Sequence, residues 1–398
     1  MSARRIPGFL PPRLAKRAQV KYNNGKSSGK RKMRMNIVHL VNFAGASGSE
    51  KYVRTLFTRQ IAQGHRVTLV YNINGPLVEA AKAAGADVRQ LTMHSPLDFI
   101  AGRKLAVICR EKETDVIHTH FPRENCIAIL AKRHMPSLTV LNTSHLVFTS
   151  GALWRILNRR FSPKDAAVLC VCTEQLKTLE ANGVRKDRLH VVHNGIPPVD
   201  APALRAEHRG KIRQEFGISE DAPVFITLAR FTHSKGLDVL VRAMEKVHAS
   251  APDAKLIIAG QGEDFEKIGA QIKEAGLEDT VFTPGFRTDS QALLAAADLY
   301  VNTSRSGEAL SFAIIEAMAM GLVPVISDAG GNPDIVDQNS DWGVQFASED
   351  EKALASILSD LAKNPRRMHE MGEKARARAA QEFTEDKMYT ETMRYYKE

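Results

Sequence analysis

The fold is decided by residues 306–321, which read S-G-E-A-L-S-F-A-I-I-E-A-M-A-M-G. They lie between two short apolar runs, residues 299–301 and 322–326. Those runs predict buried strands, and residues 312–320 between them predict a helix that has Ser311 as its N-cap and ends at a glycine. A strand, a helix and a second strand in this order are the unit of a parallel sheet.

Two glutamates occupy special places in this unit. Glu308 falls in the loop after the first strand, and Glu316 lies just over one turn into the helix. In an open parallel sheet, ligands bind at the carboxyl ends of the strands. Two carboxylates there can accept hydrogen bonds from sugar hydroxyls, while free N–H groups at the helix N-terminus hold phosphate.

The same alternation of strand and helix patterns extends over the 398 residues. Gly195, Pro197, Pro198 and Pro202 cluster within residues 194–207, which predicts a link between two alternating series. The chain after the second series looks purely helical. We therefore expect an α/β protein with two Rossmann-like, doubly wound parallel-sheet domains, a cleft between them, and a C-terminal helical segment.

The net charge of +10 comes from the N-terminal tail. Residues 1–34 contain eleven Lys or Arg and no acid, whereas residues 35–398 carry 44 basic and 45 acidic side chains. The tail is rich in Pro, Gly, Ser and Asn, so we expect disorder. It could be an electrostatic arm for anionic lipid or nucleic acid, or a targeting segment, although it lacks an apolar core. A true translation start at Met33 or Met35 is the third interpretation.

Composition places the rest of the chain among globular proteins, with 43% apolar and 25% charged residues. No run of about 18 apolar residues exists, so we expect no transmembrane helix. Cys170 and Cys172 alternate along a strand-like run and should pack in the core on one face, as free thiols in a reducing cytosol.

Ten short motifs in a fixed order give the chain a resemblance to a known family. They are S-G-S-E-K (47–51), G-H-R-V (64–67), D-V-I-H-T-H (115–120), T-S-H (143–145), H-N-G-I (193–196), A-R-F-T-H-S-K-G (229–236), A-G-Q-G-E (259–263), P-G-F (284–286), the glutamate pair and S-D-A-G-G (327–331). In this order they resemble the retaining glycosyltransferases of family 4 (group 1), which have the GT-B architecture. The resemblance runs from about residue 36 to the C-terminus.

The resemblance implies a division of labour along the chain. After the tail (1–34), it implies an acceptor-side domain (35–200), a nucleotide-sugar-binding domain (201–380) and a C-terminal helix (381–398) that packs back on the N-terminal domain.

Arg230 and Lys235 follow an apolar strand pattern and precede a helix that opens at Gly236. A nucleoside diphosphate gains negative charge as its bond to the sugar breaks, so two fixed cations would stabilise the transition state. The resemblance assigns both residues to the diphosphate. The alternative is an ordinary surface arginine and lysine.

The resemblance also distributes the donor contacts. It implies that Glu316 binds the ribose hydroxyls and that Glu308 binds the donor sugar. The alternative for Glu316 is a solvated helix residue, and the alternative for Glu308 is a partner of the helix dipole. Further donor contacts are implied at Gly48, Gly285, Phe286, Leu310, Ser311 and Phe312. The stretch Ala309–Phe312 replaces a common Gly-Phe-Gly and Ser47 replaces a common glycine, so the donor sugar and the contact at Gly48 stay open.

His145 matches a family histidine near the donor sugar and the acceptor. His118 and His120 point to one side of a strand end, and their spacing would permit a metal. We interpret them as structural or cleft-lining, and expect no bound metal and no cofactor. Basic side chains would take the role of a divalent cation.

Two open questions concern mechanism and membrane. We favour attack by the acceptor hydroxyl on the same face of the sugar from which the leaving group departs. A covalent glycosyl-Glu308 intermediate is the less favoured route. In residues 153–161, Leu153, Trp154, Leu157 and Phe161 share a helical face and arginines lie off it. This pattern suits an interfacial helix, but we favour packing against the sheet.

The sequence therefore predicts a cytoplasmic glycosyltransferase that moves a sugar from a UDP- or GDP-sugar to an acceptor hydroxyl. The acceptor would be a glycan or a lipid-linked molecule of the cell envelope, with peripheral contact to the inner face of an anionic membrane. A non-catalytic sugar-nucleotide-binding subunit is the alternative. No nucleic acid partner is expected, because the body is neutral and aromatic residues make up only 6%.

Overall fold

The computed structural model describes residues 34–145 and 151–397. By its contacts the chain separates into two units, Met1–Arg34 and Met35–Glu398, and the architecture below is that of the second unit. The interpretations of the basic tail (1–34) stay open, because residues 1–33 lie outside the described part.

The first half of this unit is a seven-stranded parallel sheet in the order β3-β2-β1-β4-β5-β6-β7. Its strands are β1 (Asn36–Phe43), β2 (Arg66–Ile73), β3 (Asp87–Gln90), β4 (Val116–Thr119), β5 (Thr139–Ser144), β6 (Ala167–Cys170) and β7 (Leu189–Val191). The intervening helices are α1 (Gly48–Ala62), α2 (Pro76–Ala84), α3 (Phe99–Glu111), α4 (Pro122–Lys132), α5 (Ala152–Phe161) and α6 (Thr173–Ala181), with short turns η1 (Ser162–Lys164) and η2 (Lys186–Arg188).

The second half is a six-stranded parallel sheet in the order β10-β9-β8-β11-β12-β13. Its strands are β8 (Val224–Leu228), β9 (Lys255–Ala259), β10 (Val281–Gly285), β11 (Leu299–Asn302), β12 (Val323–Ser327) and β13 (Val344–Phe346). Around them lie α7 (Ala201–Glu215), η3 (His233–Lys235), α8 (Leu237–Ser250), α9 (Phe265–Glu274), α10 (Ser290–Ala296), α11 (Phe312–Ala319), η4 (Asn332–Asp334), α12 (Glu351–Lys363), α13 (Pro365–Glu382) and α14 (Glu385–Arg394).

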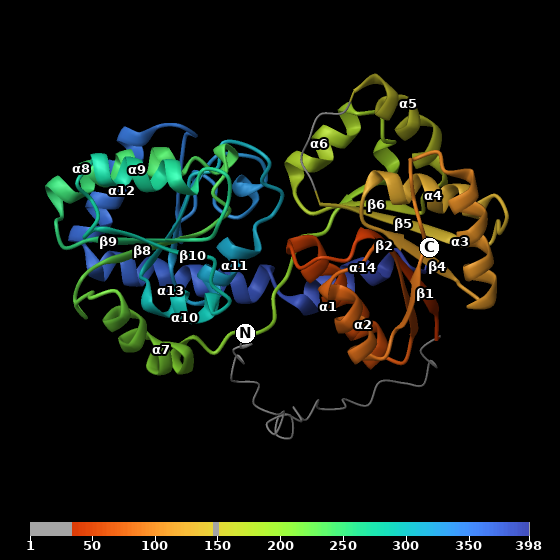
Figure 1. Cartoon of the computed structure of the whole chain (residues 1–398), viewed down its shortest axis with the longest axis horizontal. Helices are drawn as coiled ribbons and strands as arrows, with labels where there is room; N and C mark the ends of the chain where they lie inside the picture. The colour runs from red at the N-terminus through yellow and green to blue at the C-terminus, as the bar shows by residue number, and fades with distance from the viewer. Residues whose placement is uncertain (1–33, 146–150, 398) are drawn as a thin grey trace, which may run out of the picture. The chain divides into compact units, whose positions relative to one another are not determined.

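Helices cover both faces of each sheet (Figure 1). Successive residues of a strand point to opposite faces, so strands that are buried on both faces carry mostly apolar residues. In β1, Ile37 and Val41 join the core with α1 and α2, while Val38 and Leu40 join the core with α3 and α4. The prediction of two Rossmann-like parallel-sheet domains is confirmed.

The chain passes between the two halves twice, and the two passages pair with each other. The N–H of Ile196 donates to the carbonyl of Phe383 (2.9 Å), and the N–H of Glu385 donates to the carbonyl of Ile196 (3.0 Å). A Cβ on Gly195 would lie 2.1 Å from the carbonyl oxygen of Thr384, so only glycine fits at this position. After the second passage, α14 packs on the first half, with Met388 and Tyr389 in the same core as β1.

Local differences from the sequence prediction have simple causes. Residues 194–207 are only partly a link, because α7 begins at Ala201, with the Asp200 side chain as its cap and Pro202 in its first turn, where proline is tolerated. Strand β13 was missed because Gln345 interrupts its three residues, so they form no continuous apolar run. Cys170 and Cys172 are buried free thiols, as predicted, but they belong to two different cores because β6 ends at Cys170.

Helix α5 packs against the first half through part of its apolar face. Leu157 and Phe161 are buried, and Trp154 is half-buried against the same core. Leu153 and Ile156 are exposed by 64% and 63%. Packing is therefore the main role of the helix, and two apolar side chains stay at the surface. Within the described residues, no helix is long and apolar enough to cross a membrane.

Candidate functional site

The polar residues of interest follow the strands at which the strand order of each sheet reverses. In the first sheet β1 and β4 are neighbours, and in the second sheet β8 and β11 are neighbours, although neither pair is consecutive in sequence. Such switch points leave a crevice outside the carboxyl ends of the strands. Gly48 follows β1, His120 follows β4, Lys235 follows β8 and Glu308 follows β11.

Glu308 and Lys235 form a buried ion pair at the switch point of the second sheet. The same carboxylate oxygen of Glu308 accepts a hydrogen bond from Ser304 Oγ (2.5 Å) and lies 3.3 Å from Asn302 Nδ2. Burial alone would favour the neutral acid, but Lys235 and these donors outweigh it and lower the pKa of Glu308. The carboxylate is therefore ionised and fixed in place.

Glycines allow the backbones around this pair to approach closely. A Cβ on Gly330 would lie 2.1 Å from the carbonyl oxygen of Glu308, and a Cβ on Gly331 would lie 1.7 Å from that of Ala309. Gly236 has a φ of +61° and lies against the carbonyl of Thr303. These contacts explain why the S-D-A-G-G and S-K-G motifs end in glycine. Together the glycines fix the position of the loop that carries Glu308.

Arg230 lies at the rim of a cavity of about 460 Å³ beyond the ends of β8, β9 and β10. Phe286, which is 72% exposed, and Gly260 line the same cavity. The N–H of Gly260 donates to the carbonyl of Gly285 (2.9 Å), and a Cβ on Gly260 would lie 1.8 Å from the carbonyl oxygen of Ala229. The G-x-G pair at Gly260 therefore serves the packing of these loops. The cavity has the volume of a small-molecule site and one exposed aromatic wall.

Glu316 faces the first half of the unit. Its carboxylate forms an ion pair with Lys51 of α1, and the Lys51 ammonium lies 5.1 Å from the centre of the Phe312 ring. Gly48 lies beside the same ring, since a Cβ added there would be 3.4 Å from Phe312 Cδ2. The loop after β1 and the N-terminus of α11 therefore meet at Glu316.

The N-terminus of α11 has the predicted form. Ser311 is the N-cap residue and Phe312 begins the helix, although the Ser311 hydroxyl makes no capping hydrogen bond. Leu310 is buried, and its carbonyl accepts a hydrogen bond from Asn194 Nδ2 (2.8 Å). Gly321 has a φ of +83° just after the helix, as the sequence predicts.

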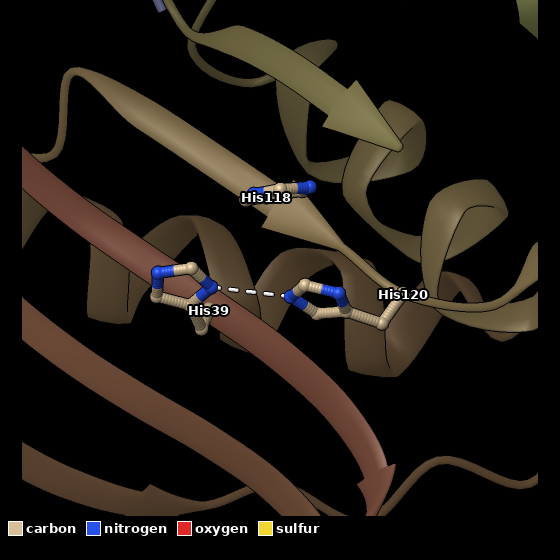
Figure 2. A group of neighbouring side chains, drawn as sticks. All are labelled: His39, His118 and His120. Atoms are coloured by element: carbon tan, nitrogen blue, oxygen red, sulfur yellow. Dashed lines mark hydrogen bonds between the residues drawn. The ribbon is translucent and has the colours of Figure 1, made fainter. Parts of the chain in front are cut away.

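His145 belongs to a row of histidines on one face of the first sheet. His39 pairs with His118 in the register of β1 and β4, and His120 lies two residues further on the same face (Figure 2). His39 Nδ1 lies 3.1 Å from His120 Nε2, and His120 Nδ1 lies 3.3 Å from His145 Nε2. Desolvation lowers the pKa of His39 to about 4 and that of His145 to about 3, so the row is neutral at pH 7.

The three buried histidines of Figure 2 also have a spacing that suits a metal, since one nitrogen from each lies within 4.8 Å of the others. Their ring nitrogens, however, already have protein partners: His39 Nε2 lies 2.8 Å from Gln60 Oε1, and His118 lies 2.6 Å from Tyr396 Oη and 2.7 Å from Thr143 Oγ1. A cation would have to displace this hydrogen-bond network.

The structure thus divides the predicted residues into three groups. Lys235 meets Glu308, Arg230 shares a cavity with Phe286, and Glu316 meets the loop of Gly48. Within residues 34–145 and 151–397, the hydrogen bonds of His145 run to His120 and none joins it to these groups.

Several participants were missed from the sequence. Lys51 stands in the S-G-S-E-K motif, but nothing local reveals that it reaches Glu316. His39 could have been found by placing it opposite His118 in neighbouring strands. Gln60 and Tyr396 carried no signal, because they meet the histidines only through the fold.

Comparison with known proteins gives two family matches. Residues 208–378 match the model of the glycosyl transferases group 1, and residues 46–199 match that of glycosyltransferase family 4. The N-acetyl-alpha-D-glucosaminyl L-malate synthase of Bacillus anthracis is 26% identical over 307 residues, covering 75% of this chain and 78% of the relative. The alpha-monoglucosyldiacylglycerol synthase of Streptococcus pneumoniae is 25% identical over 315 residues, covering 77% and 66%.

Solved structures share the fold. HepE of Anabaena in complex with UDP and glucose has a TM-score of 0.79 and 20% identity, covering 91% of this chain and 99% of its own. A glycosyltransferase of Rickettsia africae has a TM-score of 0.81 and 20% identity, covering 92% and 98%. With both halves matched and the GT-B fold in place, the chain belongs to the group 1 glycosyltransferases of the family 4 type.

Proposed function

We propose that this glycosyltransferase is a retaining, metal-independent enzyme that transfers a sugar from a UDP- or GDP-sugar to an acceptor hydroxyl. The observation that carries the proposal is the Lys235–Glu308 ion pair, which provides a cation and a fixed carboxylate at the switch point of the second sheet. Arg230 stands in the loop after the same strand β8 and adds a second cation. Such a set suits a ligand that has both a diphosphate and sugar hydroxyls.

In this proposal each residue has one task. Arg230 and Lys235 bind the diphosphate and stabilise its charge as it leaves, in place of a divalent cation. Glu316 accepts hydrogen bonds from the ribose hydroxyls, and Glu308 accepts hydrogen bonds from the hydroxyls of the donor sugar. Gly285 and Phe286 hold the base, Gly48 with the backbone of Leu310, Ser311 and Phe312 holds the phosphate and sugar, and His145 lies beside the donor sugar and acceptor.

In this proposal both glutamates bind the donor. We therefore infer that the acceptor hydroxyl attacks the same face of the sugar from which the leaving group departs. The departing phosphate oxygen would take the proton of the acceptor hydroxyl through an oxocarbenium-like state. The pairing of Glu308 with Lys235 supports this route, because a carboxylate neutralised by an ammonium is a weaker nucleophile. A trapped glycosyl-Glu308 adduct in mass spectrometry would contradict it.

We further propose that residues 35–200 hold the acceptor, that residues 201–380 hold the donor, and that residues 381–398 brace the first domain. The acceptor would be a glycan or a lipid-linked molecule of the cell envelope, and the enzyme would act in the cytoplasm at the inner face of the membrane. The exposed Leu153 and Ile156 on α5 and the name of the Streptococcus pneumoniae relative support a lipid-linked acceptor.

A thermal-shift screen against UDP-, GDP- and ADP-sugars tests the donor class. We expect one nucleotide series to raise the melting temperature, and the wild-type protein to release the matching nucleoside diphosphate. Binding without any release, even with candidate lipid and glycan acceptors, would favour the sugar-nucleotide-binding subunit. The anomeric configuration of the product, read by NMR, then tests retention.

A further inference from the structure

Gln60 of α1 lies at the end of the histidine row. Its side-chain amide has an oxygen that can only accept hydrogen bonds and a nitrogen that can only donate them. Its Oε1 lies 2.8 Å from His39 Nε2, while its Nε2 lies 3.1 Å from Tyr396 Oη and 3.8 Å from Met393 Sδ. A thioether sulfur has no proton to donate, so it suits the amide nitrogen and not the amide oxygen. Two residues at the C-terminal end of the chain therefore set the orientation of the Gln60 amide.

This orientation fixes the proton position on each histidine in turn. Because Gln60 Oε1 can only accept, His39 carries its proton on Nε2 and its Nδ1 becomes an acceptor. His120 Nε2–H must then donate to His39 Nδ1, which leaves His120 Nδ1 as an acceptor. His145 Nε2–H donates to that nitrogen, and His145 Nδ1 is left unprotonated.

A second branch from the same amide is consistent with this direction. Gln60 Nε2–H donates to Tyr396 Oη, so the tyrosine hydroxyl is free to donate to His118 Nδ1. His118 then carries its proton on Nε2 and donates to Thr143 Oγ1. All four histidines take the same tautomer, and every hydrogen bond has one donor and one acceptor.

We propose that Gln60, held by Tyr396 and Met393, is a positioning residue that fixes His145 as the Nε2–H tautomer, with an unprotonated Nδ1 at the carboxyl edge of the first sheet. The consequence for catalysis rests on the proposed function of His145. An unprotonated Nδ1 accepts a hydrogen bond from a sugar or acceptor hydroxyl, whereas a reversed row would present an N–H that donates one.

The row is well placed to act as one unit. His39, His118 and His120 are fully buried and their rings lie 4.5 to 5.4 Å apart, so water does not compete for their nitrogens. Figure 2 shows His39 on β1 and His120 just after the end of the neighbouring strand β4, joined by a hydrogen bond along the sheet face. In a buried chain of this kind, a change of proton position at one end changes every member.

Tautomers are read directly by NMR. Full-length protein labelled with 15N-histidine is examined at pH 7 in a long-range 15N–1H correlation spectrum, and the His145 signals are assigned with His145→Asn. We expect a protonated Nε2 and an unprotonated Nδ1 for His145. A protonated Nδ1, or an average of the two tautomers, would overturn the proposal, and this measurement needs neither a substrate nor a variant of Gln60.

Variants test the role of Gln60. Gln60→Met removes the acceptor and keeps the length of the side chain, so the His145 signals should lose the single-tautomer pattern. Gln175→Met makes the same change at another buried glutamine, whose Oε1 accepts from the N–H of Val171, and should leave the pattern intact. Unchanged His145 signals in Gln60→Met would refute the role of Gln60.

Turnover separates positioning from mere stability. With the donor found in the nucleotide-sugar screen, Gln60→Met should lower kcat by up to about tenfold, the effect expected when one hydrogen bond to the reacting sugar or acceptor is lost. The KM for the donor should stay within about twofold, because the described hydrogen bonds of the Gln60 side chain run to His39, Tyr396 and Met393 and not to the proposed donor contacts. An unchanged kcat in a Gln60→Met protein whose His145 tautomer has changed would contradict the proposed role of His145 in the reaction, while the inference that Gln60 sets the tautomer would stand.

Discussion

Lys235 and Glu308 join the loops after β8 and β11, the two neighbouring strands at which the order of the second sheet reverses. Glu308 is 6% exposed and the Lys235 side chain is 21% exposed. One member of the pair is therefore screened from water and depends on the other for its charge. The proposed function assigns the sugar diphosphate to the same pair.

Removing Lys235 should cost stability as well as activity. In Lys235→Met the Glu308 carboxylate stays buried without its cation, which should lower the free energy of unfolding by about 3 kcal/mol in urea titrations. The double variant Lys235→Met/Glu308→Gln should recover most of that loss but no turnover. Recovery of turnover with stability would show that the pair is only structural.

Arg230→Ala should separate binding from stability. The Arg230 side chain lines an open cavity, so its removal should change the free energy of unfolding by less than about 0.5 kcal/mol. Turnover should fall by about 10²- to 10³-fold, as when one preorganised donor to a developing negative charge is lost. Arg366→Ala, at an exposed arginine of α13, is the matched control and should retain full activity.

Lys51 and Glu316 should have opposite effects on donor affinity. If the ribose takes the carboxylate of Glu316, it has to displace Lys51 from it. The pair is partly exposed and worth at most about 1 kcal/mol, so Lys51→Met should tighten donor binding by up to about fivefold in calorimetry. Glu316→Gln should weaken it. Weaker binding in both variants would instead assign Lys51 to the phosphates.

Gly330→Ala should displace the loop that carries Glu308 and so weaken donor binding. Gly330 has a φ of +58°, and the new Cβ would lie 2.1 Å from the carbonyl oxygen of Glu308. The left-handed backbone alone costs roughly 1–2 kcal/mol, and the loop of Glu308 must move as well. Gly269→Ala in α9 meets open space and should stabilise the protein by about 0.5–1 kcal/mol. Equal effects of the two changes on donor binding would contradict the packing role of Gly330.

The histidine row should make the protein sensitive to acid. The pKa of His39 falls from 6.5 to about 4 on folding, because burial disfavours the charged ring. Stability from this histidine is therefore complete above pH 6.5 and is lost as the pH falls toward 4, since the unfolded chain binds the proton first. The wild-type protein should lose free energy of unfolding when the pH falls from 6.5 to 5. In His39→Asn this loss should be about 2 kcal/mol smaller, as measured by urea titrations at the two pH values. His94→Asn, at an exposed histidine, should leave the wild-type loss unchanged. If both variants reduced the loss equally, His39 would not be the source of the acid sensitivity.

Much of the fold could be read from the sequence because its signals are local. Strand runs such as residues 299–301 are buried on both faces and stay apolar, and the glycine after α11 marks the helix end. The start of α7 inside a proline-rich stretch was not readable, because proline is compatible with both a link and a first helical turn. Strand β13 was not readable because Gln345 interrupts its short apolar run.

The site could be predicted only in part, for a related reason. Arg230, Lys235 and Glu308 stand in motifs whose order indicates a family, whereas Lys51 meets Glu316 across 265 positions of sequence. The link from His118 to Tyr396 spans 278 positions, so no window of sequence contains it. Contacts of this kind are decided by topology, which places residues from α1 and the end of the chain over the same strands.

The most direct test of the donor site is calorimetric titration of the responding nucleotide sugar into the wild-type protein, Arg230→Ala and Arg366→Ala. The account predicts binding to the wild-type protein and to Arg366→Ala, and a loss of at least about tenfold in affinity for Arg230→Ala with its melting temperature unchanged. Equal affinity for all three proteins would contradict the placement of the diphosphate at Arg230 and, with it, the proposed site.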